Sequence, residues 1–322
     1  MKAAIVTEAG KTPVYGDFKE PVVANEENRI TVTAAALSHL VRGRASGSHY
    51  SSSGELPFVV GVDGVGRLDN GQRVYFALPK APYGSMAEVV TVPTAQCLSL
   101  PDELDDITAA AMAIPGMSSW AAYKERAKLQ AQETVLVNGA TGASGRLAIQ
   151  IARYWGAKKV IATGRNPEAL RSLRALGADV VIPLTEDAVA LESAFTEQFA
   201  AGVDVVIDYL WGKTAELLLS TGAKARREAV PIRFVQVGSV SGANITLPSA
   251  TLRSSAIVLM GSGLNSVPAN RIIKAIDEVL QAAIPGKFEI ATQAIPLSEV
   301  EKSWKMNDDR KRTVFTTGLN GK

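Results

Sequence analysis

The chain has 322 residues, of which 47% are hydrophobic and 20% charged, a composition typical of globular proteins and a length sufficient for two domains. Its 34 Lys and Arg residues nearly balance its 32 Asp and Glu residues, so no strong overall charge favours nucleic acid or an anionic membrane as a partner. The single cysteine, Cys97, excludes an internal disulfide and a cysteine-rich zinc lobe, and two histidines leave little material for a soft metal site.

The same features bear on location. Residues 1–16 lack the apolar core of a signal peptide, so we expect no export. Gly, Pro or charged residues interrupt each hydrophobic run before the ~20 residues that span a bilayer. Together with the sparse use of cysteine, this predicts a soluble cytoplasmic protein.

The first third of the chain has the pattern of a β-rich domain. Short apolar segments alternate with Gly, Pro and Asn-Gly turn signals, and they lie at residues 3–9, 29–37, 57–68, 72–78 and 86–92. Residues 38–57 are rich in Ser, Gly and Arg, which predicts a short helix followed by a long surface loop. Loops of this length inside a compact domain are often functional.

From residue 117 onward, expected strands and helices alternate. The clearest helix lies within residues 166–177, with Asn166 as N-cap, Pro167 at N1 and Gly177 just beyond its end. Apolar strands linked by helices predict a parallel sheet covered on both faces. The tail falls outside this series, so we expect a dinucleotide-binding domain at 117–260 and a substrate domain formed by 1–116 and 261–322.

A glycine-rich turn lies between an expected strand and an expected helix, in the sequence VLVNGATGASGRLAIQIARYWG at 135–156. In such a turn, backbone N–H groups approach a pyrophosphate and the helix N-terminus supplies partial positive charge. The alternative is a tight structural turn, because a glycine motif alone is weak evidence. The predicted phosphate-binding residues are Gly139, Thr141, Gly142, Ala143, Ser144 and Gly145.

The end of the next expected strand indicates which dinucleotide would bind. An NAD enzyme places Asp or Glu there to accept from the ribose hydroxyls, whereas this chain has Gly164, Arg165 and Asn166. A guanidinium can hold a 2′-phosphate that an acidic residue would repel. We therefore predict NADPH as cofactor, the alternative being that Arg165 is a solvated surface residue.

Taken together, these segments resemble the medium-chain dehydrogenase/reductase superfamily, and more narrowly its zinc-independent quinone oxidoreductase branch. The resemblance covers nearly the whole chain, because the following segments occur in the family's order: AAALS, PFVVGVDGVGRL, GQRVYF, YGSMAEVVTVP, AAAMAIPGMSSWAAY, NGATGASGRLAIQIARYWGA, ALGADVVI, DVVIDYLWG and VQVGSVSG. It implies an α/β fold in which a doubly wound Rossmann sheet is joined to a β-rich, GroES-like substrate domain built from both chain ends.

The chain departs from the zinc-dependent relatives at their metal ligands. Ser38 and Val62 replace a Cys and a His, Pro115 lies where a further Cys is expected, and only ALPKAP stands where the structural zinc lobe would be. Zinc is therefore not available to polarise a carbonyl. The resemblance then implies reduction of quinones or α,β-unsaturated carbonyls, whose negative charge after hydride addition hydrogen-bond donors can stabilise.

The candidate donors lie in the front loop. They are Ser38, which by resemblance faces the nicotinamide, and His39, His49 and Tyr50. We prefer Tyr50 as the oxyanion donor. The alternatives are that Tyr50 only lines a lid, and that His39 is structural or contacts a cofactor phosphate.

The resemblance implies further contacts to NADPH at strand ends. They are Asn138, Gly238, Ser239, Gly261 and Ser262. A basic run at Arg310, Lys311 and Arg312 is interpreted as a solvated turn, with a 2′-phosphate contact as the alternative.

Three other interpretations of the chain remain open. A short-chain reductase would use Tyr209 and Lys213 as a Tyr-x-x-x-Lys pair, but its glycine loop would begin the chain. An enoyl-thioester or alkenal reductase, or a non-catalytic NADPH-binding protein, is also compatible with the sequence. By resemblance we expect a homodimer formed through the last strand of the nucleotide sheet, at 256–262.

Overall fold

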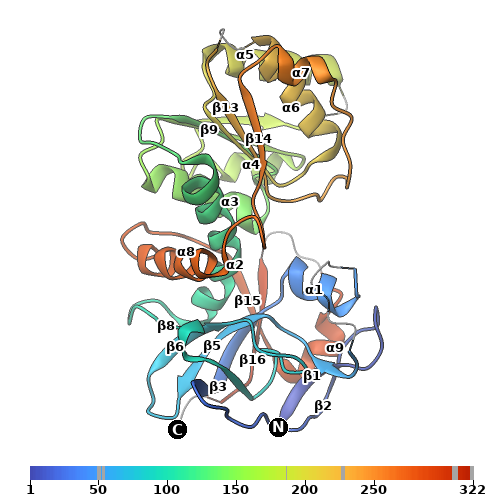
Figure 1. Cartoon of the computed structure of the whole chain (residues 1–322), viewed down its shortest axis with the longest axis vertical. Helices are drawn as coiled ribbons and strands as arrows, with labels where there is room; N and C mark the ends of the chain where they lie inside the picture. The colour runs from blue at the N-terminus through green and yellow to red at the C-terminus, as the bar shows by residue number, and fades with distance from the viewer. Residues whose placement is uncertain (49–51, 53–54, 186, 226–228, 307–310, 320–322) are drawn as a thin grey trace. The chain divides into compact units, whose positions relative to one another are not determined.

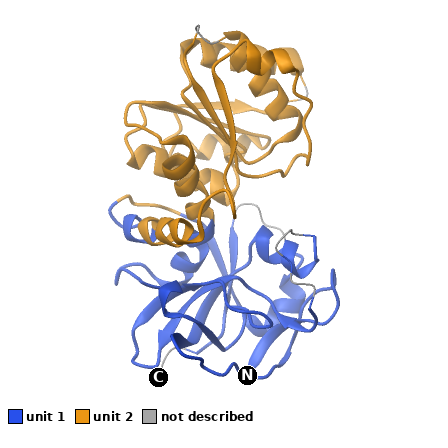
Figure 2. Ribbon diagram, in the orientation of Figure 1, with its two compact units in different colours: residues 1–114, 280–285, 290–322 blue, residues 115–279, 286–289 orange. Residues whose placement is uncertain are grey.

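A computed structural model describes residues 1–48, 52, 55–185, 187–225, 229–306 and 311–319 (Figure 1). The chain forms two compact units (Figure 2). Unit 1 comprises residues 1–114, 280–285 and 290–322, and unit 2 comprises residues 115–279 and 286–289. The sequence predicts that the chain leaves the nucleotide domain at residue 261, whereas in the structure unit 2 continues to Val279.

Unit 2 is built on a six-stranded parallel sheet with the order β11-β10-β9-β12-β13-β14. The order reverses direction between β9 and β12, which makes the carboxyl ends of these two strands the switch point where such sheets bind ligands. The strands are β9 (Thr134–Asn138), β10 (Lys159–Gly164), β11 (Val180–Pro183), β12 (Val205–Asp208), β13 (Ile232–Gln236) and β14 (Ile257–Gly261).

The central strands of this sheet are buried because both faces are covered. Every residue of β9 and β12 is buried, as expected of a parallel sheet between helices. Leu136 and Val206 pack in one core with Phe195 of α5 and Leu218 of α6. The helices that lie within this unit are α3 (Ala143–Tyr154), α4 (Pro167–Ser172), α5 (Ala188–Ala201), α6 (Gly212–Ala225) and α7 (Ser249–Arg253).

Unit 1 contains a seven-stranded sheet and a three-stranded sheet. The larger has the order β15-β16-β3-β5-β6-β8, with β7 also paired to β3, and the smaller has the order β2-β1-β4. The strands are β1 (Lys2–Val6), β2 (Val14–Asp17), β3 (Glu27–Ala36), β4 (Phe58–Val59), β5 (Asp63–Leu68), β6 (Arg73–Ala77), β7 (Val89–Pro93), β8 (Cys97–Ser99), β15 (Thr292–Pro296) and β16 (Arg312–Thr316).

The C-terminal strands complete the larger sheet of unit 1. β16 pairs antiparallel with β3, and β15 pairs parallel with β16. Phe315 of β16 packs in a core with Ala35, Val62 and Trp304. The prediction of an α/β fold with a Rossmann sheet and a second, β-rich domain is therefore confirmed.

The remaining helical elements include one that the sequence analysis does not predict. This is α2 (Asp106–Ala121), which carries Pro115 in its interior and continues into a π-helix at Ala122–Ala127. The others are α1 (His39–Ala45), α8 (Ala269–Ala282), α9 (Val300–Ser303), and two 3-10 turns at Thr94–Gln96 and Leu297–Glu299. Within the described ranges, none of these helices is both long and apolar enough to cross a bilayer.

Candidate functional site

The glycine turn joins β9 to α3, and the structure gives a physical reason for glycine at two of its three glycine positions, Gly139 and Gly145. Gly139 has a φ of +85°, a left-handed conformation that other residues rarely adopt. A Cβ on Gly145 would lie 2.5 Å from the Cα of Ala140, so the helix could not approach the turn as closely. A Cβ on Gly142 would meet nothing within 4 Å, which leaves open space beside the helix start.

The N-terminus of α3 is suited to an anion. Gly142 is the N-cap residue and provides no side-chain hydrogen bond to the first turn, so the N–H groups there remain available to a ligand. Thr141, Ala143 and Ser144 are partly exposed around it. The arrangement can hold a phosphate group, and the phosphate-binding role of these residues stays a prediction.

The end of β10 lies against this turn. A Cβ on Gly164 would come within 2.5 Å of the Thr141 Cγ2 atom, so only glycine permits the close approach. Arg165 follows and is exposed. Asn166 is the N-cap of α4, where its Oδ1 accepts from the N–H groups of Glu168 and Ala169 at 2.9 and 3.0 Å.

A buried polar network occupies the switch point of the sheet. The Asn138 Nδ2 donates to the Asp208 Oδ1 at 2.7 Å, and the Asn138 Oδ1 accepts from the Thr163 hydroxyl at 2.7 Å. The Thr163 hydroxyl also accepts from the N–H of Gly139 at 3.1 Å. Asn138, predicted as a cofactor contact, is fully buried and acts here by holding the glycine turn.

Asp208 is a participant that the sequence analysis does not identify. Its carboxylate also accepts from the N–H groups of Leu210 and Trp211. Burial raises the pKa of Asp208, and these hydrogen bonds oppose that shift. A charged residue at the end of an otherwise apolar strand is the signal that marks it in the sequence.

A cavity of about 410 Å³ lies at the carboxyl ends of β13 and β14. It is lined by Trp211, Gln236, Ser239, Ala243, Leu259, Met260 and Gly261. Ser239 and Gly261, two predicted cofactor contacts, are therefore brought together. Gly238 instead packs on the main chain of Tyr209, since a Cβ would lie 2.7 Å from that residue's carbonyl oxygen, and the Ser262 N–H donates to the Gln236 carbonyl at 2.9 Å.

In unit 1, the structure places two of the four predicted catalytic residues. Ser38 is 5% exposed and is the N-cap of α1, where its Oγ accepts from the Val41 N–H at 3.0 Å. His39 is the first residue of that helix and is exposed. His49 and Tyr50 lie outside the described residues, so their roles stay predictions.

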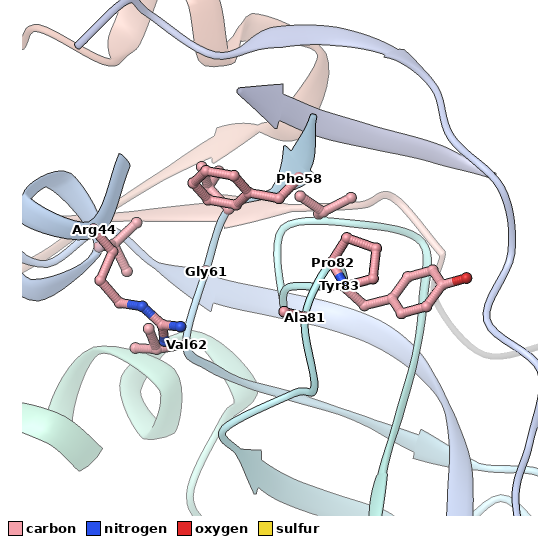
Figure 3. Close-up of a pocket in the computed structure, with 10 residues that line it drawn as sticks. Arg44, Phe58, Gly61, Val62, Ala81, Pro82 and Tyr83 are labelled. Atoms are coloured by element: carbon pink, nitrogen blue, oxygen red, sulfur yellow. The ribbon is translucent and has the colours of Figure 1, made fainter. Parts of the chain in front are cut away.

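A second cavity in unit 1, of about 20 Å³, is shown in Figure 3. Arg44 reaches toward Gly61 and Val62 there, and Phe58 and Pro82 supply apolar walls. Burial lowers the pKa of Arg44. The volume suits about one water molecule and is too small for a quinone.

Asp63, the residue after Val62, belongs to a buried cluster of ionisable side chains with Tyr75 and Arg312. The Tyr75 hydroxyl donates to the Asp63 Oδ2 at 3.0 Å, and Asp63 is 1% exposed. Burial raises the pKa of Asp63 to about 7, while the charge of Arg312 lowers it. Arg312 is thus a structural residue of β16 facing Asp63, which corrects its interpretation as part of a solvated turn; Lys311 is exposed and Arg310 lies outside the described residues.

The Tyr-x-x-x-Lys interpretation is not supported by the surroundings of its tyrosine. Burial raises the pKa of Tyr209 to about 12, and its hydroxyl lies 2.8 Å from the Ser119 Oγ. A tyrosine acting as acid and base needs a pKa near the working pH. Lys213 is exposed.

The surroundings of Cys97 and of the positions that carry zinc ligands in relatives are also visible in the structure. The Cys97 Sγ accepts from the Asn28 Nδ2 at 3.5 Å, and Val62 is 2% exposed in an apolar core. Among the residues that the structure describes, no group of three or more His, Cys, Asp or Glu side chains is arranged to bind a metal.

Comparisons with known proteins agree with this geometry. Residues 143–281 match the family of zinc-binding dehydrogenases. The chain is 28% identical to "Probable NADPH-dependent quinone reductase" of Emericella nidulans, over 96% of this chain and 98% of that protein. It is 29% identical to "Quinone oxidoreductase" of Lama guanicoe over 65% of this chain and 66% of that protein.

Solved structures extend the similarity to the whole fold. The quinone oxidoreductase of Thermus thermophilus, whose structure was also solved in complex with NADPH, superimposes with a TM-score of 0.82 at 25% identity, covering 98% of this chain and 100% of that one. The resemblance found in the sequence is thereby confirmed. In sequence and in fold, the chain is similar to the quinone oxidoreductases of the medium-chain dehydrogenase/reductase superfamily.

Proposed function

We propose that this protein is an NADPH-dependent oxidoreductase that reduces quinones or α,β-unsaturated carbonyl compounds by hydride transfer. The observation that carries the proposal is the uncapped N-terminus of α3 beside the open face of Gly142, at the switch point of the sheet. An anion-binding turn in this position is how such sheets hold a dinucleotide. The relatives named for NADPH-dependent and quinone reductase activity support the same assignment.

The described residues fit NADPH along the carboxyl edge of the sheet. The turn from Thr141 to Gly145 would hold the pyrophosphate, and Arg165, with Asn166 beside it, would hold the 2′-phosphate. The cavity at β13 and β14, with Ser239 and Gly261 in its wall, would take the nicotinamide end, with Gly238 and Ser262 on the adjoining backbone. Asn138 supports the turn through Thr163, whose hydroxyl donates to the Asn138 Oδ1 and accepts from the Gly139 N–H.

The chemistry proposed needs hydrogen-bond donors at the acceptor's oxygen. When bound, the reduced nicotinamide supplies the hydride. The negative charge that develops on a quinone or enone oxygen is stabilised by donors held at that position. Tyr50 is the proposed principal donor, with Ser38, His39 and His49 as further candidates; the Ser38 Oγ accepts from the Val41 N–H, which leaves its own O–H able to donate.

Zinc is not part of the proposed mechanism. The support comes from residue identity: Ser38, Val62 and Pro115 stand where zinc-dependent relatives carry ligands, and none of these side chains binds Zn²⁺ as Cys or His does. Cys97 lies in β8 and is hydrogen-bonded to Asn28. The protein is accordingly proposed to act in a reducing compartment, the cytoplasm, with its one cysteine free.

The proposed homodimer forms through β14. Within the described part of the sheet this strand pairs only with β13, and Val258 on it is 47% exposed. An unpaired apolar edge is suited to continuing the sheet into a second copy. Gel filtration is expected to give the mass of a dimer, and elution as a monomer would contradict this proposal.

A panel of acceptors tests the activity. NADPH oxidation is followed at saturating cofactor with 9,10-phenanthrenequinone, 1,4-benzoquinone, an alkenal series and crotonyl-CoA, and turnover of the quinones or alkenals is expected. Turnover of crotonyl-CoA alone identifies an enoyl-thioester reductase instead. NADPH binding in calorimetry with no turnover of any acceptor identifies a non-catalytic binder, and absence of NADPH binding refutes the proposal as a whole.

A further inference from the structure

Tyr209 has a buried hydroxyl that no step of the proposed reaction uses. The residue follows directly on β12, next to Asp208, and is 9% exposed. Its hydroxyl lies 2.8 Å from the Oγ of Ser119, a fully buried residue of α2. Burying a hydroxyl group lowers the stability of the fold unless the group forms a hydrogen bond. The hydrogen-bond partners of this pair therefore indicate its structural role.

The direction of these hydrogen bonds follows from the neighbours of Ser119. Its Oγ lies 3.1 Å from the Ser144 carbonyl oxygen and 3.2 Å from the Pro115 carbonyl oxygen. Carbonyls only accept, which favours donation of the single Ser119 proton to one of them. In that arrangement Tyr209 donates to Ser119. Burial, which raises the pKa of Tyr209 to about 12, keeps that proton in place at neutral pH.

The Ser144 carbonyl belongs to the first turn of α3, the turn whose N–H groups face the phosphate site. A second bond lies one turn further along both helical segments, where the Tyr123 hydroxyl donates to the Ala148 carbonyl at 3.0 Å. The donors and the acceptors are each four residues apart. The Ser119 contact and the Tyr123 hydrogen bond therefore meet α3 at two points one turn apart.

The main chain of Tyr209 also contacts the other loops at this edge. Its N–H donates to the Asn138 carbonyl at 3.0 Å, and its carbonyl accepts from the Val240 N–H at 3.3 Å. Gly238 approaches it so closely that a Cβ would lie 2.7 Å from the same carbonyl. One residue thus contacts the strand end before the glycine turn, the Gly238 to Val240 loop and, through Ser119, the start of α3.

We propose that Tyr209 is a positioning residue for NADPH, which through Ser119 holds the first turn of α3 where its N–H groups can bind the pyrophosphate. The inference rests on the proposed function and deepens it. Binding of an anion at a helix terminus depends on the first turn, because the effect falls off within that turn. Loss of the hydroxyl pair therefore weakens cofactor affinity while the chemical step is retained.

A double-mutant cycle tests this role. NADPH dissociation constants are measured by calorimetry for the wild type, Tyr209→Phe, Ser119→Ala and the double variant. Each single change is expected to weaken NADPH binding about fivefold, the effect of one lost neutral hydrogen bond. Because Tyr209 acts through Ser119, the double variant is expected to bind within about twofold of Ser119→Ala.

Kinetics separates positioning from catalysis. In Tyr209→Phe, KM for NADPH is expected to rise by the same factor as the dissociation constant, with kcat at saturating NADPH within about twofold of the wild type. A fall in kcat with unchanged NADPH affinity would overturn the proposal and make Tyr209 a catalytic group. Additive losses of affinity in the cycle would overturn the route through Ser119.

Tyr123→Phe is the matched control: like Tyr209→Phe it removes one buried tyrosine hydroxyl, here the one that donates directly to the Ala148 carbonyl of α3. Ala148 is four residues farther from the phosphate end, so NADPH affinity is expected to change less than about twofold, while urea unfolding shows a loss of stability similar to that of Tyr209→Phe. Equal losses of affinity in both variants would refute a specific role for Tyr209. A wild type that binds no NADPH refutes the proposed function; a wild type that binds, with variants of unchanged affinity, refutes this inference alone.

Discussion

The Nδ2 atom of Asn138 donates to the Oδ1 atom of Asp208 across 2.7 Å, and both side chains are fully buried. The two residues end the neighbouring strands β9 and β12, where the strand order of the sheet changes direction. A hydrogen bond between them joins the two halves of the nucleotide-binding sheet beneath the glycine turn. The pair consists of a buried amide and a buried carboxylate, so replacing either group alone is expected to lower the free energy of unfolding.

Asn138→Asp is expected to destabilise the protein by about 3 kcal/mol at pH 7, because it places a second buried carboxylate beside Asp208. Adding Asp208→Asn restores one amide and one carboxylate in swapped positions, with the Thr163 hydroxyl still able to donate to residue 138. The double variant is expected to recover at least half of the lost free energy of unfolding, measured by urea denaturation. A double variant no more stable than Asn138→Asp would contradict the pairing.

Arg165→Asp tests the assignment of NADPH over NADH. We expect NADPH binding to weaken by at least about tenfold, because a charge-assisted contact to the 2′-phosphate is replaced by repulsion. NADH, which lacks that phosphate, is expected to lose less than about threefold in affinity. Calorimetry with both nucleotides measures the difference, and Arg253→Asp, which changes an exposed arginine at the end of α7, controls for net charge. Equal losses for the two nucleotides would refute the assignment.

Ser38→Ala is expected to lower the free energy of unfolding by about 1 kcal/mol, since α1 loses the side chain that caps its N-terminus. Ser38→Thr keeps a hydroxyl acceptor for the Val41 N–H and is expected to stay within about 0.5 kcal/mol of the wild type. Urea unfolding of the three proteins gives the comparison. An alanine variant as stable as the wild type would show that the cap contributes nothing.

Tyr50→Phe tests the proposed oxyanion donor. Loss of a hydrogen bond made to developing charge is expected to lower kcat for quinones and enones by about tenfold or more. KM for NADPH is expected to be unchanged, because the cofactor contacts lie elsewhere in the chain. Steady-state kinetics with 1,4-benzoquinone measures both constants. Turnover within about twofold of the wild type would mean that another residue is the donor.

Asp63 is expected to make stability depend on pH. Its folded-state pKa of about 7 is raised above the ordinary value of 3.8, chiefly by burial. Between these values the folded protein holds a proton that the unfolded chain releases, so the free energy of unfolding falls as pH rises from 4 to 7. The fall is at most about 4 kcal/mol, at ~1.4 kcal/mol for each pKa unit.

Asp63→Asn isolates this contribution. The variant keeps a polar group beside the Tyr75 hydroxyl and carries no titrating carboxyl. Its urea-unfolding free energy is expected to change less than that of the wild type over the same pH range. Parallel pH profiles for the two proteins would show that Asp63 does not titrate there.

Local signals in the sequence specify the nucleotide-binding elements. Asn166 and Pro167 predict the start of a helix, and in the structure Asn166 caps α4 with Pro167 in its first turn, because a cap is satisfied by residues two and three positions away. The end of that helix is less well predicted: α4 stops at Ser172, although the sequence pattern continues to Gly177.

Other elements carry no clear local signal. Pro115 and Gly116 interrupt the pattern of α2, and proline in a helix interior argues against a helix. In the structure Gly116 is the point where α2 meets Val279, since a Cβ there would lie 2.6 Å from the Val279 Cγ1 atom. The helix is stabilised here by packing against a residue more than one hundred and sixty positions away in the chain. The local sequence around Pro115 does not contain that information.

The sequence by itself determines the alternation of strands and helices in the nucleotide-binding unit, the glycine turn, the arginine after β10 and the return of the tail to the first sheet. These depend on periodicity and on residues close together in the chain. Only the tertiary structure decides that Asn138 pairs with Asp208, that Arg312 faces Asp63 and that Tyr209 reaches Ser119. Those pairs join residues between 70 and 249 positions apart. They form because folding buries the groups together and removes water as the competing hydrogen-bond partner.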